Sequence, residues 1–416
     1  MADGWRESTL GEITENFDGR RVPVREADRR PGPYPYYGAS GIVDYVENFL
    51  FDGEYLLIAE DGENLRSRNT PVAFLARGRF WVNNHAHVVR GNGHADTRFL
   101  MYALEATDIS GYLTGSTIPK LTQGNLNRIR LLIPPIPEQR AIAYVLGALD
   151  DKIEVNRRTS ETLDEMARTL FKSWFVDFDP VRAKADRMDS RLPTRIADLF
   201  PDRFQDSELG EVPQGWSVVP LPELIDVNPT RSLRKGEIAP YLDMANMPTR
   251  GHSPDTVMDR PFGSGMRFTN GDTLVARITP CLENGKTAYV DFLDDGQVGW
   301  GSTEYIVLHP KRPLPPEFGY CLARSSQFRE FAIQSMTGSS GRQRVPAESL
   351  SHFRLAAPPA PVGERFGRVV GPLFARASAA SRESRTLAAL RDTLLPKLIS
   401  GELRVKDAER LVGLAT

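Results

Sequence analysis

The chain repeats one plan of residues after about half its length, and this duplication constrains the fold more than any other feature. Each copy opens on a Gly-Trp pair and closes with a short apolar run, a proline-rich stop and a long helical pattern. The echoes are Gly4-Trp5 with Gly215-Trp216, residues 51–57 with 269–275, Trp81 with Trp300, and Leu113-Thr114-Gly115-Ser116 with Met336-Thr337-Gly338-Ser339. Their offsets of 211, 218, 219 and 223 residues are too long for a solenoid repeat and predict two tandem domains that each bury a core.

Composition places the chain among ordinary globular proteins. Its 416 residues suggest two or three domains, and a content of 40% hydrophobic and 25% charged residues is typical of a soluble fold. The chain shows no apolar signal segment and no run of about 18 apolar residues, so we expect a cytoplasmic protein without membrane contact. Cys281 and Cys321 lack the spacing of a metal site or a disulfide framework. We therefore expect no metal, and we interpret both cysteines as buried small apolar residues.

The net charge of −2, from 52 Lys and Arg against 54 Asp and Glu, argues against a protein that coats nucleic acid by bulk electrostatics. It does not exclude DNA binding, because a balanced chain can carry a basic face. A subunit whose partner holds the phosphates also has no need to be basic itself.

The globular parts of the two copies read as mixed α/β modules. Residues 1–137 contain short β-rich runs at 55–59, 71–75 and 87–89, separated by Gly, Asn and Asp turns, and a helical stretch from 97 to 106. Residues 211–361 contain matching runs at 273–276 and 305–308 and a helix around 316–325.

A long amphipathic helix is predicted after each module. Pro137 with Glu138 behind it marks a helix start, and Gly401 stands where a helix C-cap is expected. Apolar residues then recur every three or four positions, with polar Asn156 and Ser160 in the middle of the first helix. The first stripe is Ile142, Val145, Leu149, Ile153, Leu163, Met166, Leu170 and Trp174; the second is Phe366, Val370, Leu373, Ala377, Ala380, Leu387, Leu390, Leu394 and Leu398. This is the spacing of a coiled coil.

Either stripe alone is more often an amphipathic helix lying on its own domain. Two stripes of equal length at equivalent places in a duplication are each other's natural partners, however. We expect an antiparallel pair, because it generates a pseudo-twofold that a DNA backbone shares, although the linker 179–210 is long enough for a parallel pair. The expected α+β architecture has domains at 1–137 and 211–361, helical regions at 138–178 and 362–403, and a tail at 404–416.

Four segments resemble the specificity subunits of type I restriction-modification systems. They are residues 133–140 (IPPIPEQR), 170–181 (LFKSWFVDFDPV), 208–216 (ELGEVPQGW) and 394–403 (LLPKLISGEL). The resemblance covers almost the whole chain, as two target recognition domains alternating with two helical regions. It departs at the start of the second helix, where Val362-Gly363-Glu364-Arg365 stand in place of the usual Glu-Gln pair.

The resemblance implies a subunit without catalysis of its own and without a bound cofactor. Each domain would select one half of a bipartite double-stranded DNA site with an unread spacer between. Two methyltransferase subunits would dock on the chain and transfer methyl groups from S-adenosylmethionine to adenine N6. Restriction subunits that use ATP and Mg would complete the endonuclease.

The motifs of the chain agree with a non-catalytic reading. Neither Asn228-Pro229 nor Asp179-Pro180 continues into the Pro-aromatic pair that an adenine methyltransferase uses, and no Gly-x-Gly-x-x-Gly follows a strand. Gly285-Lys286-Thr287 resembles the end of a phosphate-binding loop, but Pro280 occupies the place of its first glycine.

DNA reading requires side chains that fork toward base edges, together with phosphate anchors. A Thr-Gly-Ser turn followed by a basic loop occurs in both copies, so we place the DNA contacts there and in neighbouring loops. The predicted contacts are Arg66, Arg68, Asn83, Asn84, Thr117 and Lys120 in the first copy and Arg342, Gln343 and Arg344 in the second. For any single exposed arginine, a solvated surface charge is the competing interpretation. We interpret His85 and His87, which alternate along a strand, as structural residues.

Two other functions fit the same architecture. The chain could be the recognition subunit of another type of restriction-methylation enzyme, which purification with its genomic neighbours would distinguish. It could also be a scaffold that holds two partners on a coiled coil without touching DNA. The scaffold predicts no sequence-dependent DNA binding by the assembled complex.

Overall fold

The computed structural model describes residues 4–254, 256–339 and 341–415. Met1-Ala2-Asp3, which entered the expectation of a chain without a signal segment, lie outside the described residues. The chain divides into two compact units. Unit 1 comprises the residues up to Ile153 together with those from Arg385 onward, and unit 2 comprises Glu154–Ser384. Among the described residues, no helix is long and apolar enough to cross a membrane.

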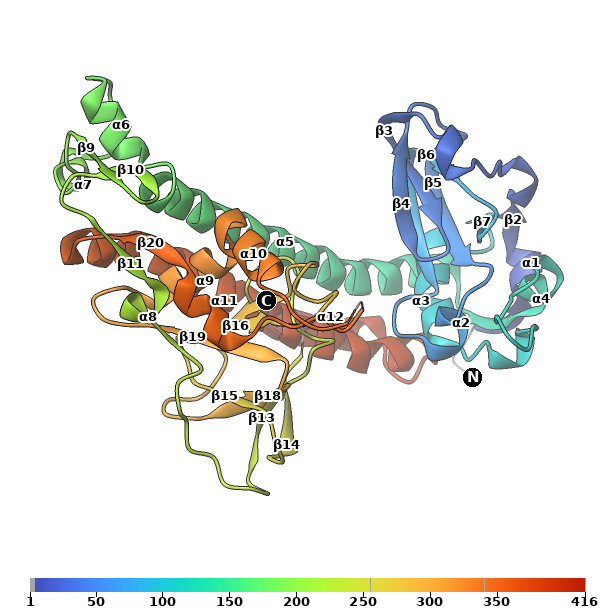
Figure 1. Cartoon of the computed structure of the whole chain (residues 1–416). Coiled ribbons are helices and arrows are strands. Elements are labelled where there is room, and N and C mark those ends of the chain that lie inside the picture. The colour runs from blue at the N-terminus through green and yellow to red at the C-terminus, as the bar shows by residue number, and fades with distance from the viewer. Residues whose placement is uncertain (1–3, 255, 340, 416) are drawn as a thin grey trace. The chain divides into compact units, whose positions relative to one another are not determined.

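Unit 1 is built on a six-stranded sheet with the order β2-β7-β5-β6-β3-β4 (Figure 1). Its strands are β2 (Thr14–Asn16), β3 (Pro31–Gly38), β4 (Gly41–Val46), β5 (Phe51–Ala59), β6 (Ala73–Val82) and β7 (Ala86–Gly91). The separate pair of β1 (Arg6–Thr9) and β8 (Arg130–Ile133) joins the two ends of the module. Helices α1 (Leu10–Ile13), α2 (Asn64–Ser67), α3 (Thr97–Ala106) and α4 (Gln123–Arg128) complete it.

Helix α3 has the bounds predicted from the sequence. The Asp96 carboxylate caps it by accepting hydrogen bonds from the backbone N–H groups of Arg98 and Phe99. Its buried residues, among them Phe99 and Leu100, belong to the core that also contains Leu56 of β5.

Unit 2 carries two four-stranded sheets, in the orders β12-β19-β16-β17 and β14-β13-β18-β15. Their strands are β12 (Ile225–Val227), β13 (Ile238–Leu242), β14 (Met258–Pro261), β15 (Met266–Phe268), β16 (Thr273–Ala276), β17 (Thr287–Tyr289), β18 (Gly299–Gly301) and β19 (Tyr305–Pro310). The pairs β9 (Phe204–Ser207) with β10 (Gly210–Pro213), and β11 (Ser217–Pro220) with β20 (Arg354–Ala357), lie outside these sheets. Its short helices are α6 (Asp179–Ala185), α7 (Thr194–Ala197), α8 (Leu221–Leu224), α9 (Pro316–Arg324) and α10 (Ser326–Gln334).

The duplication read from the sequence is present in the sheets. In unit 1, β3 and β6 pair in parallel with Tyr36 opposite Trp81. In unit 2, β13 and β18 pair in parallel with Tyr241 opposite Trp300. The echoed tryptophans therefore occupy the same position of the same strand pair.

Residues 179–210, expected as a linker, contain α6, α7 and β9. Val181, Ile196 and Phe200 from this segment are buried in the core of unit 2. Of the two cysteines, Cys321 is buried as expected, whereas Cys281 is only half-buried.

The two predicted long helices are α5 (Ile136–Phe175) and α11 (Ala360–Ile399), each of 40 residues. Gln139 fixes the start of α5, because its fully buried amide donates to the carbonyls of His94 and Pro134 and accepts from the Asp96 N–H. At the end of α11, Gly401 adopts a left-handed φ of 73° and the Leu403 N–H bonds the Lys397 carbonyl, which confirms the predicted C-cap. Helix α12 (Val405–Ala415) follows and buries Ala408 in the core of unit 1.

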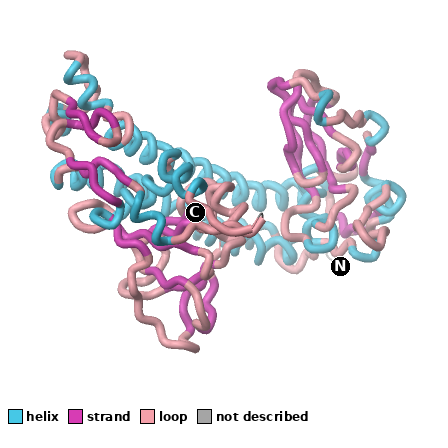
Figure 2. Tube along the Cα trace, in the orientation of Figure 1, coloured by secondary structure: helices cyan, strands magenta, loops and turns pink. Residues whose placement is uncertain are grey.

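The helices pair in antiparallel fashion, as predicted. In unit 1, Arg391 Nη1 donates to Asp150 Oδ1 at 2.8 Å. In unit 2, Asn156 Nδ2 donates to Glu383 Oε2 at 2.8 Å, and Ser160 Oγ donates to the Ala377 carbonyl at 3.1 Å. Residue numbers rise along α5 as they fall along α11 in these contacts, and Figure 2 shows the two helices side by side.

Most of the predicted coiled-coil positions face inward. Ile142, Val145, Leu149, Leu387 and Leu394 are buried. Ile153, Leu163, Leu170 and Leu373 are half-buried. Ile153 packs against the core cluster of unit 1, and Leu170 and Leu373 pack against that of unit 2. Met166 was predicted wrongly, since it is 49% exposed. Asp164, Ala167 and Phe171 are buried instead, because this part of α5 faces the body of unit 2 as well as α11.

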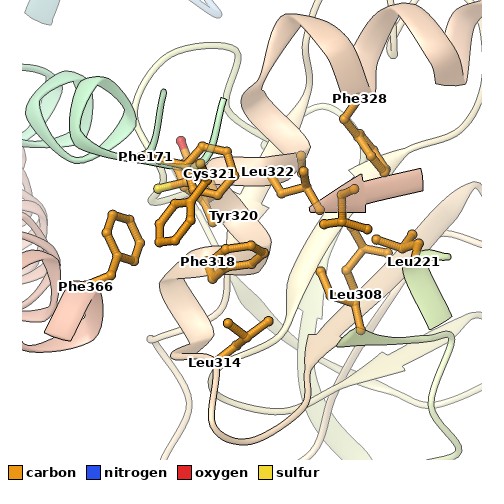
Figure 3. Packing of buried hydrophobic residues seen from close by; sticks show 14 of the residues in the cluster. Phe171, Leu221, Leu308, Leu314, Phe318, Tyr320, Cys321, Leu322, Phe328 and Phe366 are labelled. Atoms are coloured by element: carbon orange, nitrogen blue, oxygen red, sulfur yellow. The ribbon is translucent and has the colours of Figure 1, made fainter. Parts of the chain in front are cut away.

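Aromatic side chains join the helices to the body of unit 2. Figure 3 shows Phe171 of α5 and Phe366 of α11 beside Phe318 of α9. The ring centroids of Phe171 and Phe318 lie 5.1 Å apart, and those of Phe171 and Phe366 lie 6.1 Å apart. These edge contacts are specific in geometry and fix the orientation of the body of unit 2 on its part of the two helices.

Candidate nucleic-acid interface

The first predicted DNA-contact loop is closed by a backbone clasp. Thr114 and Lys120 exchange two hydrogen bonds, at 2.8 and 2.7 Å between N and O. Gly115 makes the turn possible, because its φ is +86° and a Cβ there would lie 2.2 Å from the Ile118 carbonyl oxygen. The clasp presents residues 114–118, including Thr117, to solvent.

Unit 2 has the same clasp. Thr337 and Arg344 exchange two hydrogen bonds of 2.9 Å each, and Gly338 takes a φ of +118°. Arg342 is exposed, whereas Gln343 is half-buried and its backbone binds Thr279.

Each clasp is attached to the sheet by matching hydrogen bonds. In unit 1, the Leu121 N–H bonds the Glu60 carbonyl, and the Glu60 N–H bonds the His85 carbonyl. In unit 2, the Val345 N–H bonds the Arg277 carbonyl, and the Arg277 N–H bonds the Glu304 carbonyl. Lys120 and Arg344 also form equivalent bridges, to Asp61 and Ile278.

Three positions are therefore equivalent between the units: Glu60 with Arg277, His85 with Glu304, and Lys120 with Arg344. The backbone framework is shared while the side chains and their charges differ. This is the arrangement expected of two sites that read different sequences with one scaffold.

A carboxylate contacts the basic residue of each clasp. In unit 1, Glu60 Oε1 lies 3.2 Å from Lys120 Nζ, and Glu60 Oε2 lies 2.7 Å from Arg21 Nη1. Burial raises the pKa of the Glu60 carboxyl, but hydrogen bonds from Arg21 and Lys120 and the charge of His87 outweigh it and lower the pKa overall. Glu60 is thus held ionised beneath the loop.

His87 ties the loop to the sheet from below. Its ring is 1% exposed, with Nδ1 at 2.6 Å from Asp18 Oδ2 and Nε2 at 2.7 Å from the Leu121 carbonyl oxygen. Each ring nitrogen thus lies within hydrogen-bond distance of an oxygen atom, which holds the ring in place from both sides. Burial raises the pKa of Asp18, but the hydrogen bond and charge of His87 outweigh it and lower the pKa overall. The structural role predicted for His87 matches this placement.

In unit 2, Arg344 forms a side-on ion pair with Glu304. Its Nε lies 2.9 Å from both carboxylate oxygens, and Nη2 lies 2.8 Å from Oε1. The carboxylate raises the pKa of the Arg344 guanidinium.

The remaining predicted residues of unit 1 are placed differently from one another. Arg66 is exposed and pairs with Glu63. Arg68 points inward and donates to the carbonyls of Leu104, Glu105 and Thr107, so it caps α3 rather than facing solvent. Asn83 is buried and its Oδ1 accepts from the His85 N–H, while Asn84 is exposed.

Asn83, Asn84 and His85 line a cavity of about 390 Å³ together with residues of β3 and of the segment before it. The others in its lining are Pro23, Val24, Arg25, Arg29 and Tyr36. His85 Nδ1 lies 2.8 Å from Asp61 Oδ2. Sequence reasoning missed Arg25, Arg29 and Asp61, although the run of arginines from 20 to 30 was a visible signal. Among the described residues, no three His, Cys, Asp or Glu side chains are grouped so that they could hold a metal.

Comparisons with known proteins found one matching family model and several related proteins. The family described as the type I restriction modification DNA specificity domain matches residues 2–165. The MjaIX specificity subunit of Methanocaldococcus jannaschii is 23% identical over 97% of this chain and 94% of its own length. The HindI specificity subunit of Haemophilus influenzae is 23% identical over 97% of this chain and 100% of its own length.

A solved structure shares the fold. The S subunit of a type I restriction-modification system from M. genitalium aligns with a TM-score of 0.58 at 16% identity, over 95% of this chain and 96% of that one. Along nearly its whole length, the chain is similar to specificity subunits of type I restriction-modification systems, and its residues 2–165 match the specificity-domain family model. Its two sheet-bearing modules and paired long helices share the fold of the S subunit from M. genitalium.

Proposed function

We propose that this chain selects a bipartite site on double-stranded DNA, reading one half with each unit, and that it catalyses no reaction. The observation that carries the proposal is the pair of equivalent clasps. The two units share a backbone framework but carry different side chains on it, which supports the recognition of two different DNA sequences. The spacer between the half-sites would go unread.

The exposed and half-buried polar side chains at and beside the clasps are suited to the two kinds of contact that DNA recognition uses. Arg342, Arg344 and Lys120 can reach guanine edges or phosphates, while Thr117, Gln343 and Asn84 can meet other base edges. Arg66, predicted as a DNA contact, remains one in this proposal. Arg68 and Asn83 act indirectly in this proposal, because their polar groups already bind the protein.

Docking of methyltransferase subunits is the second part of the proposal. Three large apolar side chains of α5 are exposed: Tyr144 (75%), Val155 (57%) and Met166 (49%). Val155 and Met166, which both belong to unit 2, are 11 residues apart, which is close to three helical turns, so they share one face of α5. An apolar stripe of this kind suits a helical partner surface. S-adenosylmethionine would enter with that partner, and ATP and Mg with the restriction subunits.

The test is selection of DNA from a randomised library by the chain assembled with its methyltransferase subunit. The proposal predicts recovered sequences with two short specified blocks at a fixed separation. Replacing Arg342 and Arg344 by alanine should alter one block only. Recovery of unselected DNA, or of one continuous block, would refute the bipartite reading, and the methyltransferase subunit alone serves as the control.

A further inference from the structure

The ion pair between Arg344 and Glu304 leaves a defined part of the guanidinium free. A guanidinium has five N–H groups. In this pair the edge formed by Nε and Nη2 is turned to the carboxylate, at 2.8 to 2.9 Å. Nη1 approaches the Arg342 carbonyl only at 3.4 Å. The outer edge, formed by Nη1 and the second hydrogen of Nη2, is thus available.

That outer edge matches one base. Two parallel N–H groups of an arginine fit the O6 and N7 acceptors of guanine in the major groove. The Arg344 side chain is 41% exposed and the Glu304 side chain 24% exposed, so the arginine is the accessible member of the pair.

Both partners are fixed before any ligand arrives. The Arg344 backbone is held by the clasp with Thr337. The Glu304 N–H bonds Ser302 Oγ at 3.1 Å, and its carbonyl accepts from the Arg277 N–H. A guanidinium held in one plane loses little conformational freedom when it binds, which favours a geometrically demanding contact.

The carboxylate also disfavours the wrong target. An unpaired arginine binds the phosphates of any sequence. Glu304 places a negative charge beside Arg344 and so opposes a phosphate at that position, whereas the neutral edge of a base is tolerated. The ion pair between Arg344 and Glu304 therefore favours contact with a base edge over contact with the DNA phosphates.

Lys120, which is equivalent to Arg344 in unit 1, does not offer a forked pair of N–H groups. Lys120 pairs with Glu60 at 3.2 Å, but an ammonium is a point charge without a fork. The same framework thus supplies a directional contact in unit 2 alone.

We propose that Glu304 is a positioning residue that presents the outer edge of Arg344 to a guanine in the half-site read by unit 2. The inference rests on the proposed function, since it names the base that one clasp reads.

The test uses the chain assembled with its methyltransferase subunit and a randomised DNA library, at several salt concentrations. The variants are Glu304→Gln and Arg344→Lys. The matched control is Glu208→Gln, which breaks another carboxylate–arginine pair of unit 2, with Arg354 Nε at 2.7 Å from Glu208 Oε1. Lys120→Met identifies the half-site that belongs to unit 1.

The wild-type chain should specify a guanine in the half-site that Lys120→Met leaves unchanged. Glu304→Gln and Arg344→Lys should each reduce the preference at that single position, by roughly tenfold or more for a lost bidentate contact. Glu304→Gln should in addition strengthen binding to unrelated DNA at low salt, and Glu208→Gln should change neither quantity.

Two results overturn the inference. Base preferences that stay the same in both variants would show that the pair reads nothing, and a uniform loss on all sequences would assign Arg344 to phosphate. A wild-type complex without any sequence preference would instead refute the proposed function itself, so the two failures are distinguishable.

Discussion

The length of the paired helices should set the spacing of the two DNA half-sites. The chain passes between its units at two points, between Ile153 and Glu154 in α5 and between Ser384 and Arg385 in α11. Four helix-favouring residues inserted at both points lengthen both connections equally. The contacts on either side, Asp150 with Arg391 and Asn156 with Glu383, keep their partners.

The size of the effect follows from helix geometry. Four residues add about 6 Å and about 400° of rotation, which is one full turn plus roughly 40°. At about 3.4 Å per base step, 6 Å corresponds to up to two additional base pairs of spacer. The clasps are untouched, so both half-site sequences should stay the same. A two-residue insertion at both points rotates the apolar stripe by roughly 200° and should abolish the pairing.

The assay measures binding of the assembled complex to duplexes that carry both half-sites with spacers from shorter to longer than the original. The four-residue variant should prefer a longer spacer, and the two-residue variant should lose selective binding. An active four-residue variant that keeps the original spacer would show that the helices do not set the distance.

Four further outcomes are expected. Replacing Arg342 and Arg344 together by alanine should weaken binding of the assembled complex at one half-site by roughly 1–3 kcal/mol, read by competition with site variants, whereas equal loss on all DNA would mean phosphate contacts. Tyr102→Phe removes a hydrogen bond of 2.6 Å to Asp150 and should destabilise the chain by about 1–3 kcal/mol in denaturant unfolding, with exposed Tyr45→Phe as the neutral control. Asp18 and Glu60 have lowered pKa values in the fold, so their contribution to stability is present above their ordinary values of 3.8 and 4.5 and is lost as the pH falls below them; a melting temperature that stays constant through this window would contradict it. Met166→Glu should reduce co-purification with the methyltransferase subunit, while Met188→Glu, also at an exposed methionine, should not.

The repeated plan of the sequence was the most informative part of it. Trp81 and Trp300 occupy the same place in equivalent strand pairs, and Thr114 and Thr337 close equivalent clasps. Local patterns also sufficed for the long helices and for α3, because periodicity and capping residues are properties of neighbouring positions.

The carboxylates that pair with the basic residues of the clasps could not be predicted from local sequence patterns. Lys120 meets a carboxylate 60 residues earlier, and Arg344 one 40 residues earlier, so neither pair leaves a local pattern. Arg68 looked like other loop arginines, and only the fold shows that it caps α3. The prediction that Met166 is part of the buried coiled-coil stripe was wrong for a related reason. The coiled-coil spacing takes one partner helix into account, whereas this part of α5 has two neighbours and buries Asp164 and Ala167 instead.

Methylome sequencing of paired strains, with the methyltransferase subunit present in both and this chain in only one, tests the central claim most directly. We predict a bipartite N6-methyladenine motif that occurs only in the strain carrying the chain. The same motif without the chain, or a continuous motif with it, would contradict the assignment of sequence selection to its two units.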